Sequence, residues 1–244
     1  KRTQTGILDA LLAARPEITC DDTFARIRDE WQNFSGIKPI AAPPGFVGKL
    51  RHYQREGLGW FDFLQRFGFG GCLADDMGLG KTVQVLALLE SRRNGAKSDI
   101  DSGGSNKSVS SFSKSRVDQD RSRAKTTPSL VVVPRSLVFN WQQEAARFTP
   151  ALRVLTHAGA ERSKDCKHFE NYDLIITTYG TLRRDAGHLQ ETEFDLVILD
   201  EAQAIKNAKT ESAKAVRLLR AKHRLALSGT PIENHLGELW SLFE

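Results

Sequence analysis

The residues best suited to chemistry lie in one short stretch, Cys72–Thr82, with the sequence CLADDMGLGKT. It begins with residues typical of a buried strand, continues through a loop that carries Gly78 and Gly80, and ends in Lys81-Thr82 before an apolar helix. A strand, a glycine-bearing loop and a helix N-terminus in this order are the context of a phosphate-binding loop. Glycines let backbone N–H groups approach the phosphates, and the helix N-terminus adds a partial positive charge. The stretch therefore predicts a nucleotide site.

Two side chains of this stretch match the needs of nucleotide hydrolysis. We expect the Lys81 ammonium to reach the β- and γ-phosphates of ATP and the Thr82 hydroxyl to bind Mg²⁺. One position departs from the common pattern G-x-x-x-x-G-K-[ST], because Asp75 stands where that pattern has glycine. The alternative is a glycine-rich turn between a strand and a helix that contains Lys-Thr by chance.

A second pair of residues supplies the carboxylates that such a site requires. Asp200 and Glu201 follow directly after the continuous apolar run 195–199, DLVIL. We expect Asp200 to hold Mg²⁺, mostly through water, and Glu201 to orient and deprotonate the attacking water. Taken alone, Asp-Glu after a strand is usually a helix cap and a solvated acid. Combined with the phosphate-binding loop, it predicts Lys81, Asp200 and Glu201 as the catalytic residues.

The elements around these residues alternate between short apolar strands and amphipathic helices. Strands are expected at 72–74, 130–133, 153–156, 173–177, 195–199 and 223–227. Helices are expected at 50–67, 179–184 and 209–221. Three more helices are expected: one that begins at Lys81-Thr82, one that Ser136 caps, and one from His235 onward. This alternation predicts an α/β fold with a mostly parallel sheet covered by helices on both faces. Ligands of such sheets bind at the carboxyl ends of the strands, where both motifs fall.

Two regions differ in character from this pattern. Residues 1–45 are expected to form a small N-terminal helical extension followed by a proline-containing linker, and residues 46–244 to form one lobe. Within the lobe, 95–129 is rich in Ser, Gly, Lys, Arg and Asp, so it is predicted to be a disordered insertion. Its aspartates dilute its basic residues, which favours a solvated loop over a nucleic-acid contact. Because the chain ends inside an apolar helix pattern, we expect it to be a piece of a longer protein.

The bulk composition narrows the classes of protein further. Of 244 residues, 27% are charged and 40% hydrophobic, as in a soluble globular protein. No apolar run approaches the roughly 20 residues of a membrane span, so no membrane partner is expected. The net charge of +5 is compatible with a polyanionic partner without demanding one. The three cysteines lie far apart without metal-ligand spacing, which indicates reduced thiols of an intracellular protein.

Six segments together carry a family resemblance. In chain order they are LRHYQREGLGW, LADDMGLGKT, VVVPRSLVFNWQQE, IITTYGTL, DEAQAIKN and LALSGTPIEN. From Leu50 to the end, apart from the insertion, the chain closely resembles the first RecA-like lobe of the Swi/Snf family of helicase-like DNA translocases. The resemblance implies a RecA-like P-loop NTPase lobe, and it explains Asp75, because this family has an acidic residue at that position.

The resemblance also implies roles for residues whose types alone say little. For ATP binding it implies Gln54 as the adenine-reading residue, Arg51 beside the base, and the loop residues Asp75, Asp76, Met77, Gly78, Leu79, Gly80, Lys81 and Thr82. For coupling of hydrolysis to movement it implies Gln203, where many members have His, together with Ser228, Gly229 and Thr230. For the DNA track it implies Arg135, Ser136, Thr178, Tyr179 and Thr181, which suit phosphate contacts that do not read sequence.

The expected partners follow from the same resemblance. They are double-stranded DNA, a DNA-bound protein complex as a further candidate substrate, and a second RecA-like lobe of the same chain that supplies arginine fingers. Only one more helix is expected after Asn234, so that lobe is absent from this sequence. Arginine fingers are worth about 10³–10⁵ in rate in related systems, so we expect the isolated chain to bind nucleotide weakly and to hydrolyse almost none.

Two other functions stay open at this stage. The chain could be a DNA- or protein-binding module without motor activity, although intact Lys81, Asp200 and Glu201 argue against that interpretation. It could also belong to a strand-separating helicase, although the segments DEAQAIKN and SGTPIEN fit the translocase branch better. The residues of the DEAQAIKN segment and the lack of a recognisable chromatin-reading module favour a bacterial or archaeal protein at the nucleoid in the cytoplasm. The alternative is a nuclear remodeller.

Overall fold

Six parallel strands form the sheet on which the candidate residues are arranged. In spatial order they are β1 (Gly71–Leu73), β6 (Arg220–Leu227), β5 (Glu193–Leu199), β2 (Ser129–Val133), β4 (Leu174–Thr178) and β3 (Val154–His157). All five neighbouring pairs are parallel. Strands buried on both faces of a parallel sheet are nearly continuous apolar runs, and β2, whose residues are all buried, is apolar after Ser129. The predicted α/β fold with a mostly parallel sheet is confirmed.

The computed structural model describes residues 36–102, 127–163, 165–205, 207 and 210–229, and for 96–102 it describes the backbone alone. The helices predicted before residue 36 and from His235 onward, and the candidate residue Thr230, lie outside this part of the chain. Contacts divide the chain into residues 1–37 and 38–244, and the second unit carries all the candidate residues. The predicted boundary at 45/46 remains a prediction.

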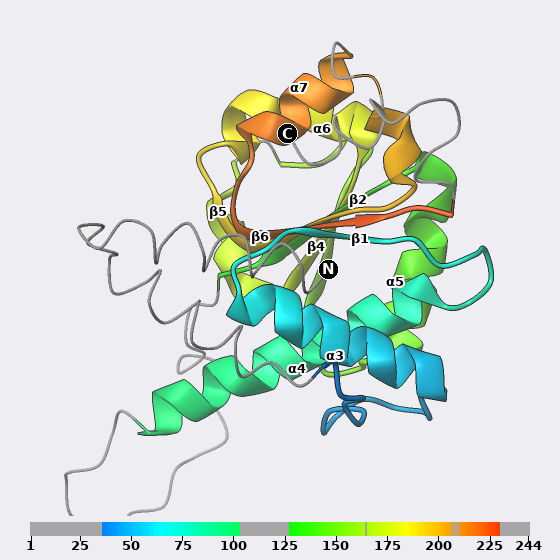
Figure 1. The fold of residues 1–244 in the computed structure, drawn as a ribbon. Helices are drawn as coiled ribbons and strands as arrows, with labels where there is room; N and C mark the ends of the chain where they lie inside the picture. Colours follow the sequence, from blue (N-terminus) through cyan, green and yellow to red (C-terminus); the bar gives the residue numbers. More distant parts are fainter. Residues whose placement is uncertain (1–35, 103–126, 164, 206, 208–209, 230–244) are drawn as a thin grey trace, which may run out of the picture. The chain divides into compact units, whose positions relative to one another are not determined.

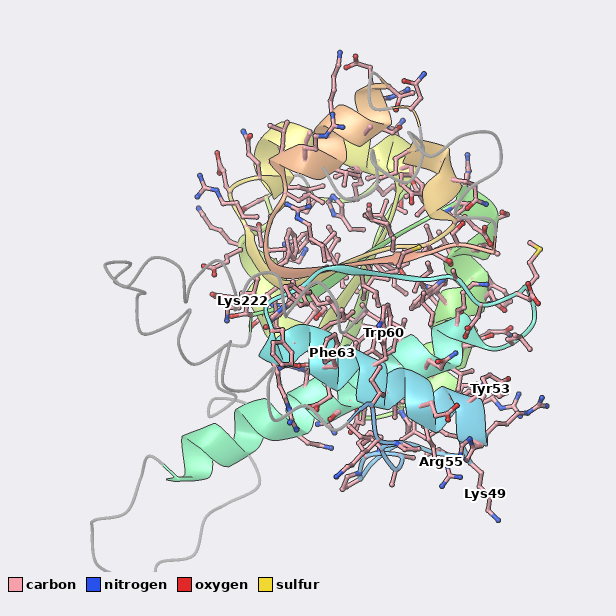
Figure 2. All side chains as sticks on the ribbon, viewed as in Figure 1. Lys49, Tyr53, Arg55, Trp60, Phe63 and Lys222 are labelled. Carbon is pink, nitrogen blue, oxygen red and sulfur yellow. The ribbon has the colours of Figure 1, made fainter. Side chains whose placement is uncertain are left out.

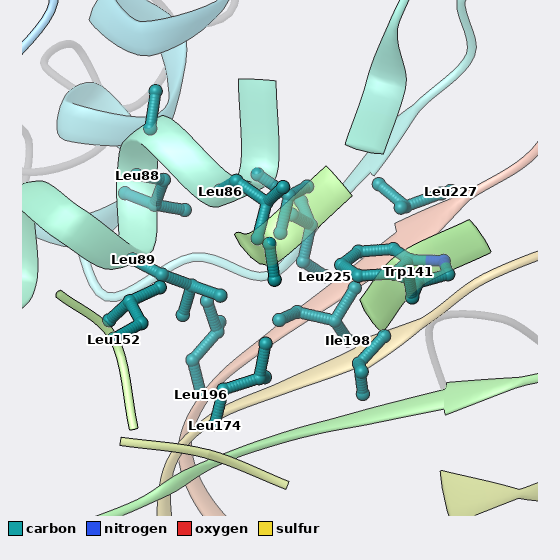
Figure 3. Packing of buried hydrophobic residues seen from close by; sticks show 14 of the residues in the cluster. Leu86, Leu88, Leu89, Trp141, Leu152, Leu174, Leu196, Ile198, Leu225 and Leu227 are labelled. Atoms are coloured by element: carbon teal, nitrogen blue, oxygen red, sulfur yellow. The ribbon is translucent and has the colours of Figure 1, made fainter. Parts of the chain in front are cut away.

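Helices cover both faces of the sheet (Figure 1). On one face lie α3 (His52–Arg66), α4 (Lys81–Ser102) and α5 (Val138–Phe148), and on the other lie α6 (Tyr179–Leu189) and α7 (Glu211–Leu218). Alternate residues of each strand point to opposite faces, so β5 sends Ile198 into one core and Val197 into the other. Figure 3 shows the first core, where leucines from α4 and the strands form one cluster with Trp141 at its side.

Several element boundaries differ from the predicted ones. Helix α4 continues to Ser102, past residue 95 where the predicted insertion begins, and the segment 103–126 lies outside the described residues. Once a helix has started, each added residue gains a hydrogen bond, so a polar composition that cannot form a core can still prolong it. Helix α7 is shorter than predicted because β6 begins at Arg220, where pairing with Glu193 of β5 extends the strand.

One predicted helix cap is also wrong. Ser136 does not cap a helix, since it lies inside a 3₁₀ turn, Arg135–Leu137, and α5 begins at Val138 without a side-chain cap. The chain before α3, in contrast, is held against the lobe by main-chain bonds. The Val47 N–H donates to the Phe148 carbonyl at 2.7 Å, and the ring of Phe46 stacks on that of Phe148 at 5.8 Å. Among the described helices, none combines the length and the apolar character needed to cross a bilayer.

Candidate nucleotide-binding site

The two motifs predicted to act on nucleotide meet at the carboxyl ends of three neighbouring strands. The phosphate-binding loop follows β1, Ser228-Gly229 follows β6, and Asp200-Glu201 follows β5. Figure 1 shows the loop leaving β1 and returning into α4 at one end of the sheet. The Ser228 N–H donates to the Leu73 carbonyl at 3.2 Å, which ties the end of β6 to the start of the loop. Parallel packing has thus gathered residues, such as Lys81 and Asp200, that lie 119 positions apart in the sequence.

The loop has the backbone geometry that its glycines predict. Gly78 and Gly80 have φ angles of +83° and +77°, which side-chain-bearing residues rarely adopt. A Cβ at Gly80 would also lie 2.7 Å from Nε2 of Gln54. The Lys81 ammonium donates to the carbonyls of Asp75 at 2.6 Å and Asp76 at 3.2 Å, so it lies folded across the loop. An ammonium held in this position lies where phosphates would be received.

Asp75, the residue that breaks the common pattern, has a structural role. Its Oδ2 accepts a hydrogen bond from Nε2 of Gln84 at 2.8 Å, and Gln84 is 1% exposed on α4. The bond fixes the start of the loop to the helix that ends it. Sequence reasoning missed Gln84, because a glutamine in an apolar helix carries no signal of its own.

The start of α3 is also bonded to the loop. Tyr53 and Gln54 both donate to the Leu79 carbonyl, at 3.0 Å from Tyr53 Oη and 3.1 Å from Gln54 Nε2. Oε1 of Gln54 accepts from the Arg51 N–H at 2.9 Å. Figure 2 shows Tyr53 near one end of α3 and Phe63 toward the other. Each group of the Gln54 amide has capacity for one more hydrogen bond, so its reading of adenine stays a prediction.

Asp200 is buried without a cationic side chain beside it. It is 6% exposed, its Oδ2 accepts from the Trp141 indole N–H at 2.8 Å, and its Oδ1 accepts from the Glu201 N–H at 3.0 Å. Burial raises the pKa of the Asp200 carboxyl and the Glu201 charge raises it further, against the lowering effect of the two hydrogen bonds and of Lys81. Among the described residues, no Lys, Arg or His forms an ion pair with it.

These features fit a magnesium ion. Mg²⁺ commonly uses one or two protein carboxylates and a hydroxyl, and takes its other ligands from water and phosphate. In the part of the chain that the structure describes, no group of three or more Cys, His, Asp or Glu could hold a metal without such help. A buried carboxylate stabilised only by neutral donors and a more distant Lys81 gains from a cation. Asp200 and Thr82 therefore remain the predicted magnesium-binding residues.

Glu201 begins a short chain of hydrogen bonds toward β6. It is the one non-glycine residue of the described chain with a positive φ, +48°, a conformation that costs energy and often marks functional sites. Gln203 donates from Nε2 to Glu201 at 2.6 Å, and Ser228 donates from Oγ to Oε1 of Gln203 at 3.0 Å. The structure thus brings the predicted base and the coupling residues Gln203 and Ser228 into contact, with Gly229 beside Met77.

The residues predicted to contact DNA fall into two groups. Arg135 and Ser136 are exposed in the 3₁₀ turn after β2. Thr178 and Thr181 are 8% and 1% exposed, and Thr178 Oγ1 accepts from the Thr181 N–H at 3.1 Å as the N-cap of α6. The Thr178 hydroxyl also donates to Oγ1 of Thr181 at 3.0 Å, so the two buried hydroxyls bond to each other, and their direct phosphate contacts stay a prediction.

Tyr179 links this region to the nucleotide site. Its hydroxyl donates to the Asp200 carbonyl at 2.8 Å, and burial strongly raises the pKa of its phenol. This side chain therefore positions the strand end that carries the two carboxylates predicted to be catalytic. The sequence pattern contains no sign of that contact or of the one from Trp141, since both join residues that are distant in the chain.

Comparison with known proteins agrees with this arrangement. Residues 53–244 match the model of the SNF2-related domain. The chain is 36% identical over 242 residues to an uncharacterized ATP-dependent helicase of Mycoplasma genitalium, covering 98% of this chain and 19% of that protein. It is 37% identical over 212 residues to the TATA-binding protein-associated factor MOT1 of Saccharomyces cerevisiae, covering 86% of this chain and 10% of that protein.

A solved structure gives the same result for the fold. The SWI2/SNF2 ATPase core of Sulfolobus solfataricus in complex with double-stranded DNA superposes with a TM-score of 0.65 at 39% identity, over 86% of this chain and 37% of that one. The chain therefore spans a fifth or less of the curated relatives and over a third of that core. The matched residues, the shared RecA-like sheet and the positions of the motifs show that the chain belongs to the SNF2-related family of helicase-like ATPases.

Proposed function

We propose that this chain is the ATP-binding motor lobe of an ATP-dependent double-stranded-DNA translocase. The observation that carries the proposal is the convergence of Lys81, Asp200 and Glu201 at one end of the sheet, with Glu201 joined through Gln203 to Ser228. The Sulfolobus structure was solved with double-stranded DNA, which supports duplex as the substrate. YwqA of Bacillus subtilis, named as a candidate ATP-dependent helicase/translocase, is 40% identical over 205 residues.

In this proposal each residue has a stated task. The Lys81 ammonium leaves the carbonyls of the loop and pairs with the β- and γ-phosphates, which are stronger acceptors because they are charged. Thr82 and Asp200 hold Mg²⁺, which supplies charge neutralisation at the phosphates when it is bound. Glu201 takes the proton of the attacking water. Gln203 bonds to both Glu201 and Ser228, so protonation or movement of Glu201 would shift Ser228 at the end of β6.

The complete motor requires parts beyond this chain. A second RecA-like lobe would close over the nucleotide and supply arginine fingers, and a DNA-bound protein complex would be the object that the motor displaces. We place the protein in the cytoplasm of a bacterium or archaeon, at the nucleoid, with the nucleus as the alternative. In keeping with this proposal, the isolated chain should show almost no hydrolysis, and turnover by the isolated chain that duplex DNA stimulates would contradict it.

The test is ATP hydrolysis by the full-length protein with and without duplex DNA, beside the Glu201→Gln variant. We expect strong stimulation by duplex and its loss in the variant, with nucleotide binding retained. Hydrolysis that is indifferent to DNA, or stimulated by RNA alone, would overturn the duplex assignment. An unwinding assay separates the remaining alternative, since a translocase displaces bound proteins without separating strands. Failure of wild type to bind ATP would favour a binding module.

A further inference from the structure

Helix α5 carries a carboxylate that none of the roles above uses. Oε2 of Glu144 is buried and accepts no hydrogen bond from any described residue. Its other oxygen, Oε1, accepts only a long bond of 3.3 Å from Nδ2 of Asn140. A buried carboxylate oxygen without a hydrogen-bond donor costs free energy. Such an oxygen in a folded protein indicates a donor from a bound water, ion or ligand.

The position of Glu144 indicates where that donor would come from. Glu144 lies three residues after Trp141, so the two side chains leave the same face of α5, and Trp141 already holds Asp200 at 2.8 Å. The pKa of Glu144 is raised, first by burial and then by the charge of Asp200, and the Thr82 hydroxyl is among the groups that lower it. Helix α5 packs against α4, which begins at Lys81-Thr82, and Trp141 bonds to Asp200, so the side of α5 that carries Glu144 lies toward both predicted magnesium-binding residues.

The chemistry of magnesium supplies a suitable donor. Mg²⁺ parts with its water reluctantly and keeps several waters when it binds to nucleotide sites. Those waters donate strong hydrogen bonds, and carboxylates just outside the direct ligands commonly accept them and tune the affinity for the metal. A carboxylate with one free oxygen beside Thr82 and Asp200 has the correct charge and acceptor capacity for that task.

We propose that Glu144 is a positioning residue that accepts hydrogen bonds from the hydration shell of the magnesium ion held by Thr82 and Asp200. This inference rests on the proposed function, because it needs a magnesium–nucleotide site. It assigns α5 two contributions to that site: Trp141 orients the carboxylate of Asp200, and Glu144 orients the water around the ion. Removal of the Glu144 charge should weaken the binding of Mg²⁺ more than the binding of the nucleotide.

The experiment is a titration of Mg²⁺ into the full-length protein with a fluorescent, non-hydrolysable ATP analogue. For Glu144→Gln, the Mg²⁺ concentration at half-maximal binding should rise about 10–100-fold, while binding of the analogue in excess chelator stays unchanged. Glu161→Gln, an equal charge change at an exposed position, should match wild type. Glu144→Asp keeps the charge but shortens the side chain, so it provides a second variant and should show a smaller rise.

The outcomes separate this inference from the proposed function. If wild type binds the analogue equally well with and without Mg²⁺, the proposed function fails and the inference fails with it. If wild type depends on Mg²⁺ and both Glu144 variants share its half-maximal concentration, the inference alone is overturned. A lower melting temperature with unchanged Mg²⁺ dependence would assign Glu144 a structural role and would overturn the inference as well.

Discussion

Two buried aspartates of the lobe, Asp200 after β5 and Asp185 on α6, have opposite electrostatic surroundings. Asp185 is 3% exposed and accepts from Arg162 at 2.6 Å and 2.7 Å, with His157, the last residue of β3, at 3.0 Å. Arg162 and His157 lower the pKa of Asp185, whereas burial raises that of Asp200, which is bonded only to neutral donors. One carboxylate is neutralised by basic side chains of the protein, and the proposed function gives the other a magnesium ion as its partner.

The comparison indicates which part of the lobe is structural and which is functional. Asp185 belongs to α6 and joins it to β3, at the edge of the sheet away from the phosphate-binding loop. Asp200 lies at the end of β5, two strands from β1 and its loop. Burying a carboxylate is expensive, so a protein keeps one where it is paired or where it has a task. Asp185 meets the first condition, and under the proposed function Asp200 meets the second.

The largest effect is expected from Asp200→Asn. Loss of the charge that is proposed to hold Mg²⁺ should lower ATP hydrolysis by the full-length protein about 10²–10³-fold. The free energy of unfolding should stay within about 1 kcal/mol of wild type, because an asparagine can still accept one of the two hydrogen bonds. Steady-state ATPase assays and urea unfolding measure the two quantities. Wild-type hydrolysis by Asp200→Asn would contradict the functional role given to Asp200.

The matching change, Asp185→Asn, should show the reverse pattern. It leaves Arg162 without its partner, and the side chain of Arg162 is only 11% exposed, so the free energy of unfolding should fall by about 3 kcal/mol. The rate of hydrolysis per folded molecule should change little. Urea unfolding followed by tryptophan fluorescence checks the first statement, and a folded variant with wild-type stability would show that the Asp185 cluster is not structural.

A smaller effect is expected from Trp141→Phe. The substitution keeps most of the buried ring but removes the indole N–H that donates to Asp200 at 2.8 Å. A buried carboxylate oxygen without its donor should cost about 1–3 kcal/mol of unfolding free energy. Saturating Mg²⁺ and nucleotide should restore part of that loss, because the ion replaces the missing partner. Equal losses with and without Mg²⁺ and nucleotide would argue that Trp141 serves only the core.

The smallest effect concerns pH. Burial lowers the pKa of His157 below its ordinary value of 6.5, so the unfolded chain takes up this proton at a higher pH than the folded one. The stability that His157 contributes is therefore present above about pH 6.5 and is lost as the pH falls through the folded-state pKa. His157→Gln should show a shallower loss of unfolding free energy between pH 7.5 and 5. His188→Gln, at an exposed position, should lose unfolding free energy with falling pH as steeply as wild type does. The same steepness in His157→Gln would contradict the role given to His157.

The sequence was sufficient for the features that depend on local order. The phosphate-binding loop, the apolar strand before Asp200 and the alternation that predicts a parallel sheet are each written within a dozen residues. A parallel sheet then places the ends of its strands at one edge, so the meeting of Lys81 with Asp200 and Glu201 could be predicted.

What could not be predicted depends on pairs that only the folded chain brings together. Asp75 with Gln84, Asp200 with Trp141, and Asp185 with Arg162 carry no signal in spacing or composition. The capping role of Thr178 could not be predicted for a related reason, and the DNA contacts predicted for Thr178 and Thr181 stay a prediction. A hydroxyl at a helix start has its own backbone as a competing partner, and the sequence does not say which partner it takes.

The most direct measurement is the binding of Mn²⁺, as a spectroscopic substitute for Mg²⁺, to the full-length protein saturated with a non-hydrolysable ATP analogue. Electron paramagnetic resonance counts the free ion, and Asp185→Asn, as long as it folds, serves as the comparison. We predict that wild type and Asp185→Asn bind Mn²⁺ alike, while Asp200→Asn binds it at least about 100-fold more weakly. Equal binding by Asp200→Asn and wild type would contradict the claim that this buried carboxylate is kept for a metal ion.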